Sequence, residues 1–286
     1  MKVFPLAWRK KQKGETPGEV DVTKTLIGGD LHVTPSNHQH IGSRENQEDS
    51  FALSDLTDRK LVAESGVLAL VADGMGGLAL GEEASRVAVQ VFLREHLPRE
   101  SDESVPQRLH RALVTANIAV FDRAYQDGTE LELGTTMVAT LVRKSELYWI
   151  SVGDSRIYHL RNNTLTQLTR DHIYKNQLMD DVRKGFLTKA QAESHPEGAY
   201  LTSYLGLPAL TEINKNSEPL LLEPGDWILL CSDGLYNSFT DEEIKLFLNN
   251  TEQTSAENLV KRVLAKNLKY QDNITVVLLS CNSVGK

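Results

Sequence analysis

The chain has 286 residues, 40% of them hydrophobic, and a formal net charge of -8 at pH 7. This length and composition suffice for one large domain with a full apolar core. The acidic balance argues against a nucleic-acid-binding protein, which normally presents a basic face, so we expect a protein or small-molecule partner.

Cysteine use and hydropathy indicate the compartment. Cys231 and Cys281 both lie in apolar runs, so a disulfide framework is not expected and a reducing compartment is favoured. No segment approaches the roughly 18 apolar residues that span a bilayer. The basic cluster at Lys10 to Lys13 follows a short apolar stretch, the reverse of a secretory signal. We therefore expect a cytoplasmic protein without a membrane span.

Residues 1–36 lack hydrophobic periodicity and are rich in glycine and proline. This composition predicts a flexible N-terminal tail, within which Thr23 to Asp30 is a candidate edge of the fold. Residues 37–286 are then expected to form one domain.

Beyond the tail, the apolar pattern alternates between strand and helix periods. Short polar turns join four strands from 135 to 169 into an antiparallel meander, and the mixed, polar residues 171–208 indicate an insertion over a site, here called the flap. The expected strands are 49–53, 67–72, 135–142, 146–153, 155–161, 164–169, 226–232 and 273–281, and the expected helices are 81–97, 106–125, 172–184, 189–194, 240–248 and 255–268. This order predicts α+β layers rather than a parallel doubly wound sheet.

Five predicted core strands each carry an acidic residue at one end. These residues are Glu48 with Asp49, Asp73, Asp154, Asp233 and Asp272. One aspartate in such a place is usually a turn former. If four of these ends meet at one edge, however, the charges repel one another unless cations neutralise them. Oxygen ligands without a nearby histidine or cysteine favour magnesium or manganese over zinc.

The glycines after Asp73 fit such a site, because Gly74 can offer its backbone carbonyl and Gly76 with Gly77 permit a sharp turn. The same stretch, GMGGLA, also fits a dinucleotide-binding loop, but a helix through Leu97 fills the interval in which that fold needs a second strand ending on an acid. A cysteine-dependent phosphatase loop at Cys231 is also disfavoured, because Asn237 stands where that loop needs arginine.

With these residues assembled, the sequence resembles the metal-dependent serine/threonine protein phosphatases of the type 2C class, in their bacterial form. The resemblance covers about residues 38 to 281. It rests on SRENQED (43–49), VADGMGG (71–77), GTT (134–136), VGDSR (152–156), CSDGL (231–235) and DNIT (272–275). It implies a four-layer α-β-β-α sandwich, in which helices flank two antiparallel sheets and a binuclear metal centre lies at one edge.

The resemblance also implies residue roles. The implied metal ligands are Glu48, Asp73, Gly74, Asp154, Asp233 and Asp272, and the implied catalytic residues are Arg44, Asp49 and Asp73. Asp73 would bridge the two metals, Glu48 would act through water, and Asp154 with Asp233 would form a weaker third site. Arg44 would grip the substrate phosphate through its planar fork.

The implied activity is hydrolysis of phosphoserine and phosphothreonine in proteins. Two manganese or magnesium ions that share a water lower its pKa from about 15.7 toward about 7, so that a metal-bridging hydroxide attacks the phosphorus. We expect phosphorylated protein substrates, an opposing serine/threonine kinase and a monomer. The alternative is a catalytically weak relative that acts as a phosphoprotein-binding regulatory module.

Two positions depart from the family pattern. Met75 stands where many relatives have a histidine that protonates the leaving group, and Ser203 stands in the flap where bacterial relatives often have arginine. Two flap histidines, His172 and His195, are interpreted as surface or capping residues rather than ligands.

Overall fold

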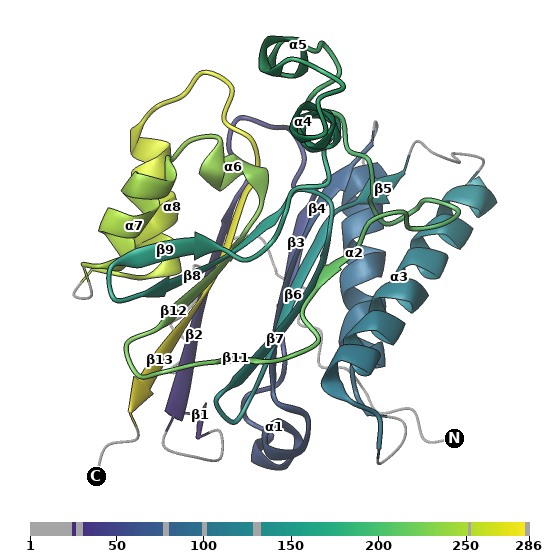
Figure 1. The fold of residues 1–286 in the computed structure, drawn as a ribbon. Coiled ribbons are helices and arrows are strands. Elements are labelled where there is room, and N and C mark those ends of the chain that lie inside the picture. The colour runs from purple at the N-terminus through teal and green to yellow at the C-terminus, as the bar shows by residue number, and fades with distance from the viewer. Residues whose placement is uncertain are drawn as a thin grey trace.

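The computed structural model describes residues 25–26, 31–76, 80–98, 102–127, 133–250 and 253–283. In this part of the chain two antiparallel sheets pack face to face, and helices cover the outer face of each (Figure 1). The expected four-layer sandwich of the α+β class is confirmed. Within the same residues, no helix combines the length and apolar character that crossing a membrane requires.

The two sheets contain six and seven strands. In spatial order, the first sheet consists of β1 (Thr25–Leu26), β2 (Leu31–His40), β13 (Ile274–Ser283), β12 (Trp227–Cys231), β8 (Arg156–Arg161) and β9 (Thr164–Gln167). The second consists of β10 (Asn214–Lys215), β7 (Glu146–Val152), β6 (Met137–Arg143), β4 (Val67–Met75) and β3 (Asp49–Leu53), with β11 (Leu220–Leu221) beside β7 and β5 (Gly134–Thr135) beside β4.

Helices cover both outer faces and lie at both ends of the sandwich (Figure 1). The second sheet is covered by α2 (Leu80–Glu95) and α3 (Val105–Asp127), and the first by α7 (Asp241–Leu248) and α8 (Ala256–Ala265). At the upper end in Figure 1 lie α4 (Tyr174–Arg183), α5 (Lys189–Glu193) and α6 (Asp233–Tyr236), and at the lower end lies α1 (Arg59–Ser65).

Alternation along β4 builds two of the three core layers. Val67 and Val71 point into the layer between the sheets, whereas Leu68 and Leu70 point toward α2 and α3. Successive strand side chains face opposite sides, so one continuous apolar run can serve both layers. The third layer lies between the first sheet and the helices α7 and α8.

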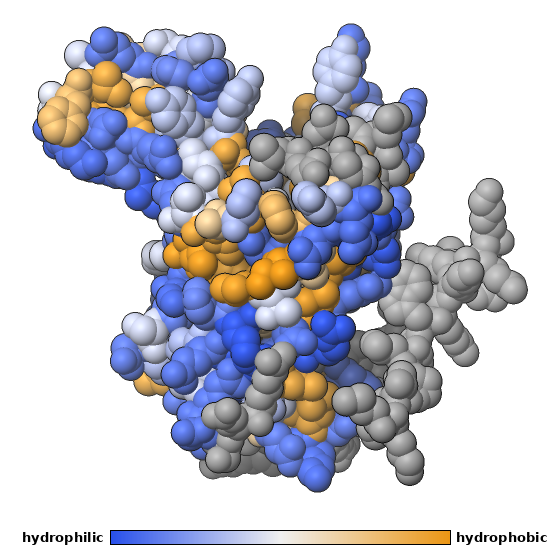
Figure 2. All heavy atoms as spheres, turned by 90° about the vertical axis from the view of Figure 1, so that its right-hand side faces the viewer, coloured by the Kyte–Doolittle hydropathy of each residue, from blue (hydrophilic) through white to orange (hydrophobic). Residues whose placement is uncertain are grey.

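Helix α3 also presents apolar side chains to solvent. Val114, Ile118 and Tyr125 are exposed at helical spacing. Figure 2, which views the side of the molecule on which α3 lies, shows an apolar band across its middle. The apolar residues of α3 therefore extend beyond its core face.

The expected four-strand meander divides between the two sheets. Strands β6 and β7 pair in the second sheet, and β8 and β9 pair in the first. The turn from Gly153 to Ser155 carries the chain across. Gly153 has φ +94°, and a Cβ there would lie 2.7 Å from the Cβ of Thr136, so this turn needs glycine.

Strand β2 begins inside the segment expected to be a tail. It pairs with β13 from Leu31 onward, and both Leu31 and Val33 are buried between the sheets. Strand β1, which lies within the candidate edge Thr23 to Asp30, pairs with β2, so the first sheet begins before the expected boundary at residue 36. The segment 31–40 carries few apolar residues, which hides its strand period. Residues 1–24 and 27–30 lie outside the described part of the chain.

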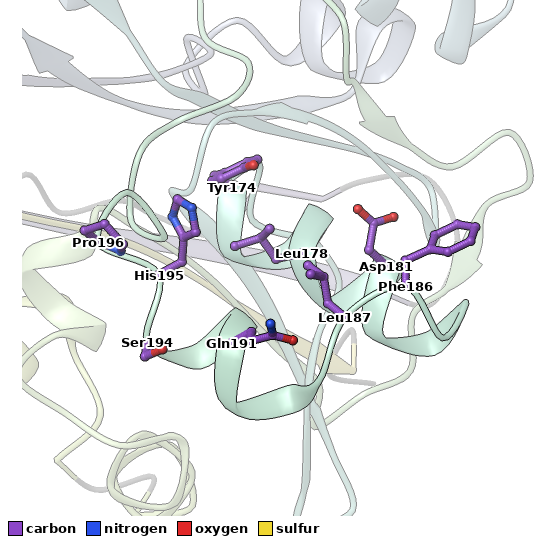
Figure 3. Close-up of a pocket in the computed structure, with 9 residues that line it drawn as sticks. All are labelled: Tyr174, Leu178, Asp181, Phe186, Leu187, Gln191, Ser194, His195 and Pro196. Carbon is purple, nitrogen blue, oxygen red and sulfur yellow. The ribbon is translucent and has the colours of Figure 1, made fainter.

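The flap (residues 171–208) contains α4 and α5, and its two ends meet at its base. Ile173 forms an antiparallel bridge with Leu201. The rings of Tyr174 and His195 meet edge to face, with centroids 5.1 Å apart, beside a hollow between the two helices (Figure 3). None of the strand-end carboxylates lines this hollow.

The burial of β2 leads to a stability prediction. Val33→Ala should lower the free energy of unfolding by about 2 kcal/mol, because it removes buried methyl groups and leaves a cavity. Asn37→Ala, at an exposed position of the same strand, is the matched control and should change stability by less than about 0.5 kcal/mol. Urea unfolding of both variants measures the difference. Equal stabilities would contradict a core role for residues 31–36.

Candidate active site

Two aspartates from neighbouring strands form the centre of the site. The register of β3 and β4 places Asp49 directly opposite Asp73. Asp49 is 4% exposed, and its Oδ2 accepts a hydrogen bond of 2.7 Å from the hydroxyl of Ser232. Its buried Oδ1 has no hydrogen-bond partner among the described residues. Burial raises the pKa of Asp49 to about 6, and burial followed by repulsion from Asp49 raises the pKa of Asp73 well above its usual value.

Strand β4 continues through Asp73 instead of ending there. Gly74 and Met75 pair with Thr135 and Gly134 of β5, which extends β4 to Met75. The backbone of Asp73 therefore lies within paired strands, with β3 on one side and β5 following on the other, rather than in a loop. The expected strand 67–72 therefore ended three residues too early.

Three further aspartates surround this pair. Asp233 begins α6 directly after β12, Asp154 lies in the turn between β7 and β8, and Asp272 lies just before β13. Burial, then repulsion from Asp154 and Asp272, raises the pKa of Asp233 to about 7. Asp154 also has a raised pKa, first because it is buried and then because Asp171 repels it. The structure thus brings the five strand-end aspartates close enough for their charges to interact.

Arg44 and Glu48 stand on a loop at the rim of this neighbourhood. A guanidinium nitrogen of Arg44 lies 2.6 Å from Oδ2 of Asp272, while 57% of the Arg44 side chain remains exposed. The backbone N–H of Glu48 donates to Oδ1 of Asn273 at 2.7 Å. The Asn273 amide nitrogen in turn donates to the carbonyls of Ile41 and Asn46, so one side chain holds the whole loop.

Gly74 lies at a close approach of three segments. A Cβ at Gly74 would lie 2.0 Å from the carbonyl oxygen of Gly81 and 2.6 Å from that of Glu48. A Cβ at Gly81 would lie 2.9 Å from the Glu48 carboxylate. These two glycines therefore allow the end of β4, the start of α2 and the Glu48 loop to pack backbone to backbone.

Several residues that fix the carboxylates had no role assigned from sequence. The Thr136 hydroxyl contacts the backbone N–H of Asp73 at 3.0 Å and the hydroxyl of Ser155 at 2.7 Å. Ser232 holds Asp49, and Asn273 holds the Glu48 loop. Thr136, Ser155, Ser232 and Asn273 all lie inside the quoted motifs. Their position next to the carboxylates in the sequence could have predicted that they support them.

The two departures from the family pattern and the flap histidines are now placed. The Ser203 side chain is buried and donates to the carbonyl of Glu212 at 2.9 Å, so it stabilises the flap. Met75 is half-buried at the end of β4. His195 caps the backbone N–H of Glu197, as interpreted. His172 differs from a surface residue because it is buried, with its Nδ1 accepting from the Gly153 N–H at 3.1 Å.

The donor set suits a hard divalent cation. Oxygen atoms dominate, and Asp49 keeps an unpartnered buried oxygen. Burial, and then repulsion from neighbouring aspartates, raises the pKa values of Asp73 and Asp233. In their present positions, no three carboxylate, imidazole or thiol groups of the described residues form a set that could hold a metal ion. Arg44 already binds Asp272, so ion binding requires local rearrangement of these side chains.

Comparison with known proteins agrees with this chemistry. The family model for protein phosphatase 2C matches residues 37–269. The chain is 32% identical to the serine/threonine phosphatase stp of Listeria welshimeri, over 85% of this chain and 93% of that protein. It is 35% identical to the serine/threonine protein phosphatase PstP of Mycobacterium tuberculosis, over 82% of this chain and 42% of that protein.

Solved structures give the same result. The serine/threonine phosphatase of S. agalactiae superposes with a TM-score of 0.71 at 27% identity, covering 87% of this chain and 99% of that chain. The catalytic domain of PstP in complex with two manganese ions superposes with a TM-score of 0.65 at 27% identity, covering 88% of this chain and 100% of that chain. The chain therefore belongs to the protein phosphatase 2C family.

Proposed function

We propose that this chain is a metal-dependent phosphatase that removes phosphate from phosphoserine and phosphothreonine in proteins, and that its strand-end carboxylates hold the metal ions. The observation that carries the proposal is the group of aspartates around Asp73, in which burial and then repulsion from neighbouring aspartates raise the pKa values of Asp73 and Asp233. Such a cluster is unfavourable without bound cations, and divalent ions are the natural partners of oxygen ligands.

The ligand assignment follows the family resemblance. Asp73, Asp233 and Asp272 would hold one ion. Asp73 would also hold a second ion, together with the Gly74 carbonyl and, through water, Glu48. Asp154, which repels Asp233, supplies a weaker third site. Manganese and magnesium both suit these oxygen atoms, and manganese is the first probe because a related structure contains it.

When bound, the ions acidify water and offset negative charge on the phosphoryl oxygens. Arg44 binds the substrate phosphate, because its exposed, planar guanidinium matches two phosphate oxygens. Asp49 is held by Ser232 and fixes the orientation of the Asp73 carboxylate across the strand pair. Met75 has no proton to donate, so solvent protonates the leaving serine or threonine oxygen.

A phosphoprotein-binding module without catalysis is the weaker alternative. Binding a phosphate needs positive groups such as Arg44, whereas five mutually repelling aspartates oppose an anion unless cations are present. Keeping the full acidic set therefore favours the enzyme.

The cellular setting is part of the proposal. Substrates are phosphorylated proteins, and a serine/threonine kinase supplies them. A monomer in the cytoplasm of a bacterium, acting in signalling, fits the acidic composition and the two buried, unpaired cysteines.

Removing a central carboxylate should abolish hydrolysis. Asp73→Asn and Asp233→Asn should each lower kcat on a phosphothreonine peptide by at least about 100-fold with manganese present, because each removes a charged ligand. Asp122→Asn, exposed on α3, is the matched control and should retain activity within 2-fold of the wild type, roughly the scatter of surface changes. Chelator should stop the wild-type enzyme, and full activity in excess chelator would contradict the metal mechanism.

The repulsion also predicts a pH-dependent stability difference without metal. A carboxylate whose pKa is raised in the folded state destabilises that state above the folded pKa, and the loss shrinks as pH falls toward the unfolded value. For Asp233 the folded pKa is about 7. Asp233→Asn should therefore stabilise the metal-free protein more at pH 8 than at pH 5.5, by about 1 to 2 kcal/mol.

Urea unfolding of the wild type and Asp233→Asn at the two pH values measures this difference. Comparing the variant with the wild type at each pH removes the contribution of His96, whose pKa burial lowers to about 4 and which is present in both proteins. Manganese should stabilise the wild type more than the variant. A variant that is less stable than the wild type at pH 8 without metal would show that Asp233 is structural.

Arg44→Ala should separate phosphate recognition from ion binding. We expect KM for the phosphopeptide to rise about 10-fold or more, on the scale of a lost charge-assisted bond. Calorimetric titration with manganese should show affinity that is unchanged or tighter, because Asp272 loses its competing partner. Lys261→Ala, on the exposed face of α8, is the control. Loss of a manganese site in Arg44→Ala would refute this role.

A further inference from the structure

Two residues at the start of the flap grip the turn around Asp154 from both sides. One residue before Asp154, Gly153 accepts from the backbone N–H of His172 at 3.0 Å and donates its own N–H to Nδ1 of that ring at 3.1 Å. Two residues after Asp154, Arg156 forms a forked ion pair with Asp171, with Nε at 3.1 Å from Oδ1 and a terminal nitrogen at 2.7 Å from Oδ2. Asp154 is thus fixed between two contacts to the flap.

The ion pair is enclosed by polar and aromatic groups. The side chains of Arg156 and Asp171 are 21% and 9% exposed. Gln167 donates to Asp171 at 2.8 Å, and Arg156 donates to the hydroxyl of Tyr158 at 2.9 Å. The guanidinium carbon of Arg156 also lies 3.6 Å from the centre of the Tyr236 ring. A shielded, forked pair of this kind fixes geometry more firmly than an exposed one.

Tyr236 extends this contact to a second carboxylate. Its hydroxyl donates to the backbone carbonyl of Asp154 at 3.1 Å. The same tyrosine ends α6, whose first residue is Asp233. The Arg156 guanidinium therefore packs on the side chain that joins the Asp154 turn to the helix of Asp233.

The other end of the flap joins the same contacts. The carbonyl of His172 accepts from the N–H of Thr202 at 2.8 Å, and Asn214 contacts Nε2 of the ring at 2.8 Å. A displacement of the flap base would therefore pull directly on Gly153 and Arg156.

We propose that Asp171 is a positioning residue for the phosphatase reaction, which acts through Arg156 and Tyr236 to fix Asp154 relative to Asp233 and to couple that arrangement to the flap. This inference rests on the proposed function, which assigns Asp154 and Asp233 to the ions. Asp171 itself touches neither substrate nor ion.

The chain offers a matched pair that serves only the fold. At the opposite end of β8, Arg161 forms a forked pair with Asp226, with a nitrogen at 2.6 Å from Oδ2, and Asp226 is 1% exposed. If the Arg156 pair were merely structural, Asp171→Asn and Asp226→Asn would affect catalysis alike.

Steady-state kinetics on a phosphothreonine peptide with manganese provide the first test. Asp171→Asn should lower kcat/KM by about 10-fold or more, the scale of a small misplacement of a catalytic group. In an Asp154→Ala background it should lower kcat/KM by less than about 2-fold, because nothing remains for it to position. Asp226→Asn should stay within about 2-fold of its parent in both backgrounds. Gln167→Ala, a milder change at the same carboxylate, should act in the same direction as Asp171→Asn.

Hydrogen exchange of the metal-free protein provides the second test. Asp171→Asn should speed exchange at the amides of Gly153, His172 and Thr202 by about 10-fold or more, because the flap base opens locally. The amide of Leu229 in β12 should not change, and Asp226→Asn should leave the flap base as in the wild type.

The outcomes separate this inference from the proposed function. Equal losses from Asp171→Asn in both backgrounds, an equal loss from Asp226→Asn, or full activity of Asp154→Ala would each overturn the positioning role. Unchanged exchange at Gly153 would overturn the coupling to the flap. Activity that survives Asp73→Asn would instead overturn the proposed function.

Discussion

The confinement of mutually repelling carboxylates to one junction of the two sheets is the constraint on which the site depends. Asp49 and Asp73 are opposite each other in a hydrogen-bonded ladder, so they cannot separate without breaking β3 from β4. Asp233 is fixed at the first turn of α6, which directly follows a core strand. Because the fold holds these groups together, burial and then repulsion between the carboxylates raise the pKa values of Asp73 and Asp233.

Neutral groups hold these carboxylates in place. Thr136 contacts the Asp73 backbone, Ser232 bonds the Asp49 carboxylate, and Asn273 fixes the loop of Glu48. None of these residues supplies a positive charge, so they orient the site without neutralising it. Arg44, which pairs with Asp272, is largely exposed and can exchange Asp272 for another anion. The cluster therefore keeps its affinity for cations.

The sequence predicted the layers and the acidic cluster because both rest on local patterns. Strand periods located β3 to the residue, and six short motifs located the carboxylates. The missing parts depend on contacts between distant segments. The bond from Glu48 to Asn273 spans 225 positions, and no local pattern reports it. The whole of β2 was missed, because only part of that strand reaches the core. The division of the meander between two sheets was not predicted. A short turn of glycine and polar residues has the same sequence pattern whether it joins strands of one sheet or of two.

The three apolar layers explain how the fold tolerates an unfavourable site. Fully buried side chains from both sheets and from the helices α1, α2, α3, α6, α7 and α8 supply stability that does not depend on pH or ions. Against this constant background, the charge of Asp233 destabilises the metal-free protein above its pKa of about 7. Any ion that binds only the folded state removes that repulsion and adds its own binding free energy, so stability rises with ion concentration. Stability and catalysis thus depend on the same carboxylates, and replacing one by a neutral residue should stabilise the metal-free fold while it disables the enzyme.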